Sequence, residues 1–90
     1  MKTITIIVYA DPGHAWGKVK RKLLIDLGIA DKISRYSYQN NDSVFLEEDC
    51  DLSLLQGTLL RAGTIINYVE KHTNKRSRIR SYDRFEHGFN

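Results

Sequence analysis

The sequence predicts an α+β fold in a single domain that spans residues 1–90. Two stretches repeat apolar residues at helical spacing, and each is followed at once by a glycine, Gly28 or Gly63, where a helix C-cap belongs. Short runs rich in β-branched and aromatic residues lie before, between and after these stretches, and such runs are typical of strands. Ninety residues that mix both element types predict one thin core.

The first strand is expected over residues 3–9, where Ile4, Ile6 and Val8 alternate with their neighbours. The first helix is expected after the turn that follows this strand, because apolar residues recur there with a helical period. These apolar residues are Trp16, Val19, Leu23, Leu24 and Leu27. Gly28 then ends the pattern and predicts the end of the helix.

A hairpin is expected next. Residues 33–39 place Tyr36 and Tyr38 on one face of a strand, the letters NND supply turn chemistry, and SVFLE at residues 43–47 forms the returning strand. Leucine then recurs through a second predicted helix that ends at Gly63.

The remaining residues predict one or two further strands. TIINYVE at residues 64–70 is typical of a strand, and RSRIRSY at residues 76–82 forms either a short extra C-terminal strand or an extended basic arm. The order β-α-β-β-α-β matches the ferredoxin-like sandwich, an antiparallel sheet with two helices on one face. The other face of such a sheet is open, so it either binds a ligand or is covered by a second subunit, as in a homodimer.

The net charge of +3 is unevenly distributed. Residues 71–90 hold six Lys and Arg against two carboxylates, which leaves a net charge of −1 for the rest of the chain. This basic C-terminal strand or arm favours an anionic partner. A cytoplasmic location without membrane contact is expected, because the chain shows no long apolar run and no signal-peptide pattern, and a single cysteine, Cys50, excludes an internal disulfide.

The loop DPGHAW first predicts a turn, in which Asp11 accepts a hydrogen bond from the backbone two residues later. A second interpretation is an anion site, because the backbone N–H groups of a strand-to-helix turn favour an anion, and His14 and Lys18 add donors. Trp16 is either a core residue of the helix or a stacking platform.

Arginine alternates with other residues in RSRIRSY, so in an extended strand Arg76, Arg78 and Arg80 would share one face. Three guanidinium groups in a row suit phosphates or carboxylates, although edge strands also carry charges that prevent aggregation. Tyr36 and Tyr38 are candidate stacking residues on the sheet.

The acidic letters EEDCD precede the second helix, where carboxylates stabilise a helix N-terminus. They are also the residue type that metals bind, but Cys50 has no second Cys or His at ligand spacing. We therefore predict no metal site and no cofactor.

The letters DPGHAW, YSYQ, LEEDCD and IRSY resemble a signature of small phage and mobile-element proteins of unassigned function. This resemblance implies binding and inhibition of a host component, including CRISPR complexes and nucleotide-signalling immunity. IIVYAD, a basic helix and SVFLE are also similar to the ferredoxin-like nucleases that include the CRISPR-adaptation nuclease and VapD-type toxins. In that group an Asp at the end of the first strand is catalytic or binds metal, and Asp11 is the matching position.

The leading hypothesis is a non-enzymatic, phage-type accessory protein that binds an anionic host target stoichiometrically. The target would be a nucleic-acid-binding defence complex such as CRISPR, or a nucleotide immune signal. The alternative is a dimeric metal-dependent ribonuclease or phosphodiesterase that uses Asp11 with His14 as acid or base. A third hypothesis is an assembly protein that buries its open sheet in a homodimer. The predicted contact residues are Asp11, His14, Trp16, Lys18, Tyr36, Tyr38, Arg76, Arg78 and Arg80.

Overall fold

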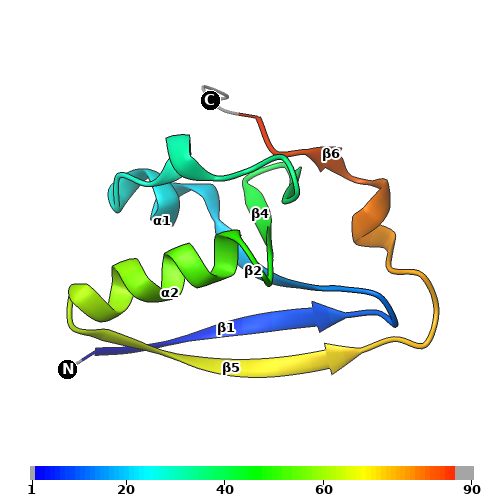
Figure 1. Ribbon diagram of the computed structural model, residues 1–90, viewed down its shortest axis with the longest axis horizontal. Coiled ribbons are helices and arrows are strands. Elements are labelled where there is room, and N and C mark those ends of the chain that lie inside the picture. Colours follow the sequence, from blue (N-terminus) through cyan, green and yellow to red (C-terminus); the bar gives the residue numbers. More distant parts are fainter. Residues whose placement is uncertain (1, 87–90) are drawn as a thin grey trace.

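The computed structural model describes residues 2–86, and these residues form an α+β fold built on one mixed six-stranded sheet (Figure 1). The order of strands in the sheet is β5-β1-β2-β4-β3-β6. In chain order the elements are β1 (Lys2–Ala10), β2 (Ala15–Lys20), α1 (Arg21–Asp26), the 3₁₀ helix η1 (Ala30–Lys32), β3 (Tyr38–Asn40), β4 (Ser43–Glu47), α2 (Asp51–Arg61), β5 (Thr64–His72), the 3₁₀ helix η2 (Arg78–Ser81) and β6 (Asp83–Arg84). The predicted α+β class is confirmed.

The predicted first helix is wrong over its first half, because Ala15–Lys20 forms strand β2 and pairs with both β1 and β4. Trp16 and Val19 point to opposite faces of the sheet, and both are buried. Since both faces are covered here, the alternation that marks a strand is lost and the apolar spacing imitates a helix. Gly17 allows α2 to pack closely on this strand, because a Cβ on it would lie 2.7 Å from Leu52 Cδ1 of α2.

The sheet is mixed, so the predicted antiparallel sheet is wrong, and the ferredoxin-like topology is not confirmed. β1 and β5 are parallel from Lys2↔Thr64 to Ala10↔His72, whereas the other pairs of neighbouring strands are antiparallel. The cause is the additional strand β2, which turns the chain round once more before α1. The connection through α2 then returns the chain to run in the direction of β1.

The strand predicted over residues 33–39 is mostly a loop, and β3 begins only at Tyr38. The carboxylate of Asp51, in the first turn of α2, anchors this loop. It accepts hydrogen bonds from the backbone N–H and hydroxyl of Ser34 and from the hydroxyl of Ser37. These bonds replace the ladder that a longer strand would have formed.

Residues 76–82 also differ from the prediction, because they contain the 3₁₀ helix η2 instead of a strand. The hydroxyl of Ser77 caps this helix by accepting a hydrogen bond from the N–H of Ile79. The short extra strand lies further along the chain, as β6, which pairs with β3. The predicted row of Arg76, Arg78 and Arg80 on one strand face therefore does not form. Residues 87–90 of the predicted basic segment lie outside the described residues.

Two apolar clusters lie on opposite faces of the sheet. The main core combines side chains of both helices, such as Leu24 of α1 and Leu55 of α2, with Ile6 and Val44 of the sheet. The smaller cluster holds Trp16, Tyr38, Phe45 and Ile79, with Tyr9 and Tyr82 packed against it. Ile79 and Tyr82 come from the C-terminal segment, which therefore covers part of the face that the sequence predicted to be open.

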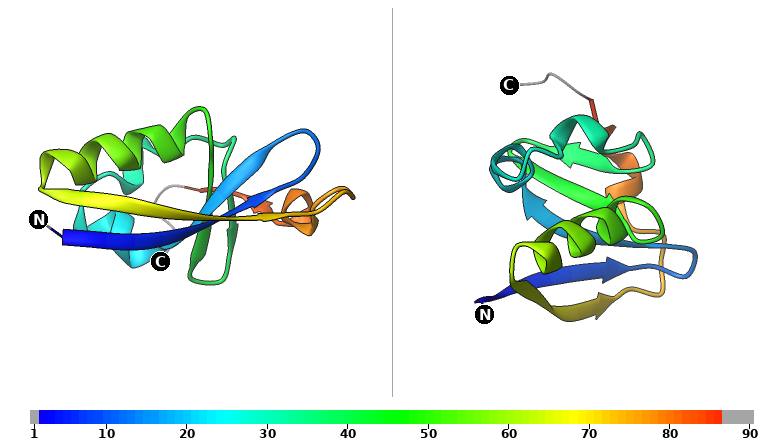
Figure 2. Two further views of the ribbon diagram at one scale, coloured as in Figure 1. Left: turned by 90° about the horizontal axis from the view of Figure 1, so that it is seen from below. Right: turned by 60° about the vertical axis from the view of Figure 1, so that its left-hand side comes forward.

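The remaining elements agree well with the sequence. The predicted strands at residues 43–47 and 64–70 are found as β4 and β5, and Gly28 and Gly63 have positive φ values after α1 and α2. Figure 2 shows how strongly the sheet twists between the β1–β5 part and the β2–β4 part. Neither helix of residues 2–86 has the length and apolarity that a membrane span requires.

Candidate functional site

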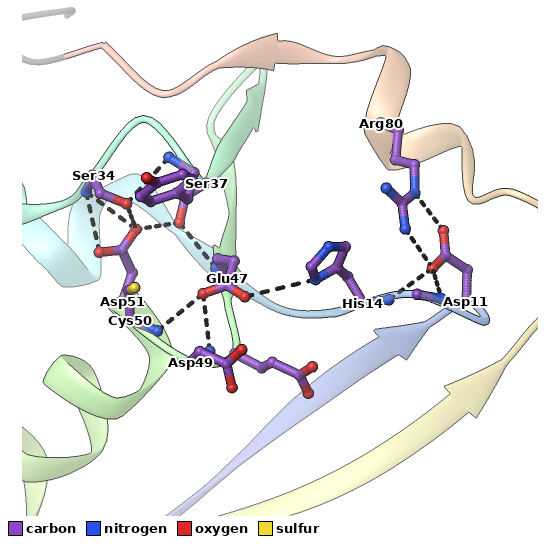
Figure 3. A network of polar contacts seen from close by, with 12 residues as sticks. Asp11, His14, Ser34, Ser37, Glu47, Asp49, Cys50, Asp51 and Arg80 are labelled. Carbon is purple, nitrogen blue, oxygen red and sulfur yellow. Dashed lines mark hydrogen bonds and ion pairs between the residues drawn. The ribbon is translucent and has the colours of Figure 1, made fainter.

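The turn between β1 and β2 is organised by Asp11, as Figure 3 shows. Asp11 Oδ1 accepts hydrogen bonds from the N–H groups of Gly13 and His14, both at 3.0 Å, which confirms the predicted turn. The turn leads into a strand, so the predicted anion site at a helix N-terminus does not form there. Asp11 also accepts from the N–H of Ser77 at 3.0 Å.

Arg80 completes this arrangement by donating hydrogen bonds to both carboxylate oxygens of Asp11. Its Nε lies 2.7 Å from Oδ2 and its Nη2 lies 2.9 Å from Oδ1, a bidentate ion pair in which the Asp11 side chain is only 2% exposed. The Arg80 guanidinium holds the pKa of Asp11 far below its usual range, against the opposing effect of burial, and three backbone N–H groups lower it further. Asp11 and Arg80 are therefore charged partners over the whole physiological pH range.

The ion pair and hydrogen bonds of Asp11 are relevant to the alternative hypothesis, a metal-dependent nuclease that uses Asp11. Both carboxylate oxygens already accept hydrogen bonds from Arg80 and the backbone, so binding a metal or activating water would require Asp11 to leave these partners. Within residues 2–86, no group of three His, Cys, Asp or Glu side chains is placed to hold a metal ion. The geometry assigns Asp11 a structural role, as the clamp that attaches the C-terminal segment to the β1–β2 turn.

The Asp11–Arg80 clamp attaches a segment of the chain that forms one wall of a groove. Residues 73–82, here called the wall segment, run from the end of β5 across the sheet, and Figure 1 shows them in orange. Ile79 of this segment is 3% exposed against the sheet, and the guanidinium of Arg80 lies 5.2 Å from the centre of the Trp16 ring. The ring of Tyr82 lies 5.2 Å from that of Phe45. The wall segment is thus fixed by apolar, cation–π and ionic contacts together.

The space between the wall segment and the sheet is an open groove of about 720 Å³, here called the basic groove. Its lining residues are Tyr9, Lys18, Phe45, Thr73, Lys75, Arg76, Ser77, Arg78, Ile79, Ser81 and Tyr82. Four of these side chains are cations, three are aromatic rings and three are the aliphatic hydroxyl side chains of Thr73, Ser77 and Ser81. No carboxylate belongs to the described residues that line the groove.

The four cations of the basic groove are Lys18, Lys75, Arg76 and Arg78, and all four are exposed. None of them makes an ion pair or a side-chain hydrogen bond with another residue of the described chain. Unpaired like charges along a concave surface add their potentials, which attracts anions and raises the rate of their binding. The three aromatic rings form a row, in which the ring centres of Tyr9 and Phe45 lie 6.3 Å apart in an edge contact and those of Phe45 and Tyr82 lie 5.2 Å apart.

A second hollow of about 440 Å³ adjoins the basic groove on the same face of the sheet. Its lining residues are His14, Trp16, Tyr36, Tyr38, Glu47, Asp49, Cys50, Arg80 and Arg84. Charges of both signs meet here, and several are already engaged. Glu47 Oε1 accepts hydrogen bonds from the N–H groups of Asp49 and Cys50, and Glu47 Oε2 lies 4.0 Å from His14 Nδ1.

Cys50 in this second hollow is not an activated nucleophile. Desolvation and the neighbouring carboxylates of Glu47, Asp51 and Asp49 raise the pKa of its thiol. The thiol is therefore protonated at neutral pH, which is the unreactive form of cysteine.

The structure divides the predicted contact residues into three groups. Lys18, Arg76 and Arg78 line the basic groove. His14, Trp16, Tyr36, Tyr38 and Arg80 line the second hollow, and within it Trp16 and Tyr38 are buried while Tyr36 is 66% exposed. Asp11 lines neither space, because it is enclosed in the clamp. Asp11 and Arg80 of the basic segment do meet, through the 3₁₀ helix η2 and not through a last strand that neighbours β1.

Sequence reasoning missed Tyr9, Phe45, Lys75 and Tyr82 as groove residues. Tyr9 and Phe45 belong to strands in which the neighbouring apolar residues face the helices. The apolar pattern of these neighbours predicted only the helical side of the sheet. Their signal was the period-2 alternation, which places them on the other face together with Lys18. Tyr82 could be assigned only after the path of the wall segment was known.

The fold and the groove together define a small α+β protein with an open basic and aromatic groove. No protein-family model matches the chain, and no curated protein or solved structure matches it either.

Proposed function

We propose that this protein binds a nucleotide-type anion in the basic groove and acts by stoichiometric capture. One observation carries the proposal. The groove combines four unpaired cations with a row of three aromatic rings and has no carboxylate among its described lining residues. Phosphates are bound by guanidinium and ammonium groups, and bases stack on aromatic rings, so both parts of a nucleotide find a partner there.

Each part of the groove has a role in this proposal. Arg76 and Arg78 lie on the wall segment, where their exposed guanidinium groups donate paired hydrogen bonds to phosphate oxygens. Lys18 and Lys75 contribute point charges. The partly exposed ring of Tyr82 offers its face to a base.

The size of the groove favours a small ligand. Its volume of about 720 Å³ falls within the range of about 300–1,000 Å³ that is usual for small-molecule sites. A nucleotide or dinucleotide is of that scale. This favours sequestration of a nucleotide immune signal over docking onto a nucleic-acid-binding defence complex such as CRISPR.

The groove's chemistry supports capture rather than turnover. No His, Cys, Asp or Glu belongs to its described lining residues, so the side chains most often used as general acids or bases are missing from this part of the chain. The resemblance to small phage proteins supplies the biological context. We therefore propose an accessory protein that inhibits a host antiviral defence component by removing its anionic signal.

Isothermal titration calorimetry tests this proposal with AMP, ATP, a cyclic dinucleotide and a short single-stranded oligonucleotide. We expect one site per chain for a nucleotide, and an affinity that falls as salt is raised, because salt screens exposed charges. The double variant Arg76→Gln/Arg78→Gln should lose at least tenfold in affinity.

The matched control is Lys22→Gln/Lys32→Gln, which removes the same charge from exposed positions outside the groove and should bind as the wild type does. The proposal fails if none of the four compounds binds. It also fails if both double variants lose affinity equally, since that would reflect net charge rather than a site.

A further inference from the structure

The strand β5 lies at one edge of the sheet, and within residues 2–86 it pairs only with β1 (Figure 1). It is nine residues long, and its first six residues, TIINYV, carry no charge. Three of its apolar side chains, Ile65, Tyr68 and Val69, are 40–46% exposed. Natural sheets usually protect such an edge with charge, proline, a bulge or a covering element, because an unpaired strand recruits another strand.

The apolar residues of β5 are arranged symmetrically about Asn67. Ile66 and Tyr68 flank it directly, and Ile65 and Val69 lie one position further out. The parallel register with β1 places Ile66 and Tyr68 on the face that carries α2, and Ile65 and Val69 on the opposite face. A strand with this symmetry is complementary to an antiparallel copy of itself, because residues that face each other across an antiparallel pair point to the same face.

From this symmetry we infer that two copies of the chain pair through β5, antiparallel, about a two-fold axis at Asn67. Ile65 of one copy then faces Val69 of the other, and Ile66 faces Tyr68, on both sides of the axis. Each contact occurs twice, as an isologous interface requires. Glu70 faces Thr64, and Lys71 faces Gly63, so this register brings no like charges directly opposite each other.

The pairing joins two sheets into one continuous sheet. The two-fold axis runs perpendicular to it, because opposing residues keep their faces in an antiparallel pair. The wall segment lies on the face opposite α2, so both basic grooves open on the same side of the dimer. The inference rests on β5 alone and does not depend on what the groove binds.

Disulfide trapping tests the register. In a Cys50→Ser background, which removes the free cysteine, we introduce Asn67→Cys. Facing Cα atoms of an antiparallel pair lie about 4.5–5.5 Å apart, a separation that a disulfide bridges. Mild oxidation should therefore yield a covalent dimer in high yield. The matched control Lys71→Cys places the two cysteines about 27 Å apart along the strands, at about 3.4 Å per residue, and should stay monomeric on a denaturing gel.

Light scattering after gel filtration tests the dimer itself. The wild type should have twice the chain mass of 10.4 kDa, and Val69→Lys should have the mass of one chain with an unchanged circular dichroism spectrum. Ile25→Lys is the control, because it replaces an exposed apolar residue of α1, away from β5, and should leave the dimer intact.

Three results would overturn the inference. One is a wild type with the mass of a single chain at all concentrations tested. Another is equal cross-linking of the Asn67→Cys and Lys71→Cys variants, which would indicate pairing without a fixed register. The third is a mass that grows steadily with concentration, which would indicate open-ended aggregation at the edge.

Discussion

The basic groove and the second hollow lie side by side on one face of the sheet, and both are lined by aromatic rings and arginines. They differ in whether their charged side chains have partners within the protein. In the second hollow Arg80 is bound to Asp11, and Arg84 lies 4.6 Å from the Tyr38 ring and donates a hydrogen bond to the carbonyl of Arg35. In the basic groove no cation has such a partner in the described chain.

The wall segment contributes to both spaces, so neighbouring arginines of one peptide have opposite roles. Arg78 is exposed towards the groove, whereas Arg80, two residues later, supports the wall. Removing an arginine from a buried carboxylate partner destabilises the fold, whereas an arginine without a partner is available to a ligand. Partner geometry, rather than arginine content, therefore distinguishes the two regions.

The strongest test of this comparison is Asp11→Ala. The substitution leaves the Arg80 guanidinium and three backbone N–H groups without their acceptor, and breaking a buried ion pair in this way costs about 3–5 kcal/mol of unfolding free energy. Urea denaturation measures the loss. Asp42→Ala is the control, since its pair with Lys20 is exposed on both sides and contributes at most about 1 kcal/mol. Equal losses in the two variants would contradict the clamp.

The second test compares two neighbouring arginines. Arg80→Gln should lower the unfolding free energy by about 2–3 kcal/mol, because the buried Asp11 carboxylate then lacks its cation. Arg78→Gln should change it by no more than about 0.5 kcal/mol, as is usual for surface positions. Denaturation of both variants under one buffer condition checks the difference, and similar stabilities would show that the two arginines are not distinguished by their partners.

The third test concerns binding. Arg78→Gln in the groove should weaken nucleotide binding about tenfold, which corresponds to about 1.4 kcal/mol. Arg84→Gln in the second hollow should leave the affinity unchanged, because its guanidinium lies over the Tyr38 ring. Calorimetric titration of the two variants measures the two affinities. If Arg84→Gln is the more harmful substitution, the ligand occupies the second hollow instead.

The smallest expected effect is the dependence of the clamp on pH. Asp11 has a folded pKa far below its unfolded value near 3.8, so its ionisation stabilises the fold above that value and the stabilisation is lost as pH falls. Between pH 5 and pH 3 the wild type should lose about 1 kcal/mol relative to Asp11→Asn, because Asn cannot be protonated in this range. Denaturation at both pH values measures the change. A constant gap between the two proteins would mean that folding leaves the pKa of Asp11 unchanged.

The sequence by itself determined the elements whose signals are local. Several signals depend on nearby residues alone: the leucine period of α2, the β-branched runs of β1 and β5, the apolar run of β4 and the glycines after both helices. The turn at Asp11 also follows from local hydrogen bonding, and the cations of the groove could be recognised as a basic segment. These features require no knowledge of what lies across the fold.

Only the tertiary structure decided the rest. Residues 15–20 became a strand because they pair with β1 and β4, and β5 became parallel to β1 because β2 adds a reversal of the chain. Arg78 and Arg80 have different roles because Asp11, distant in sequence, forms an ion pair with Arg80 and not with Arg78. Each of these outcomes depends on contacts between residues far apart in the chain, and local propensity does not encode such contacts.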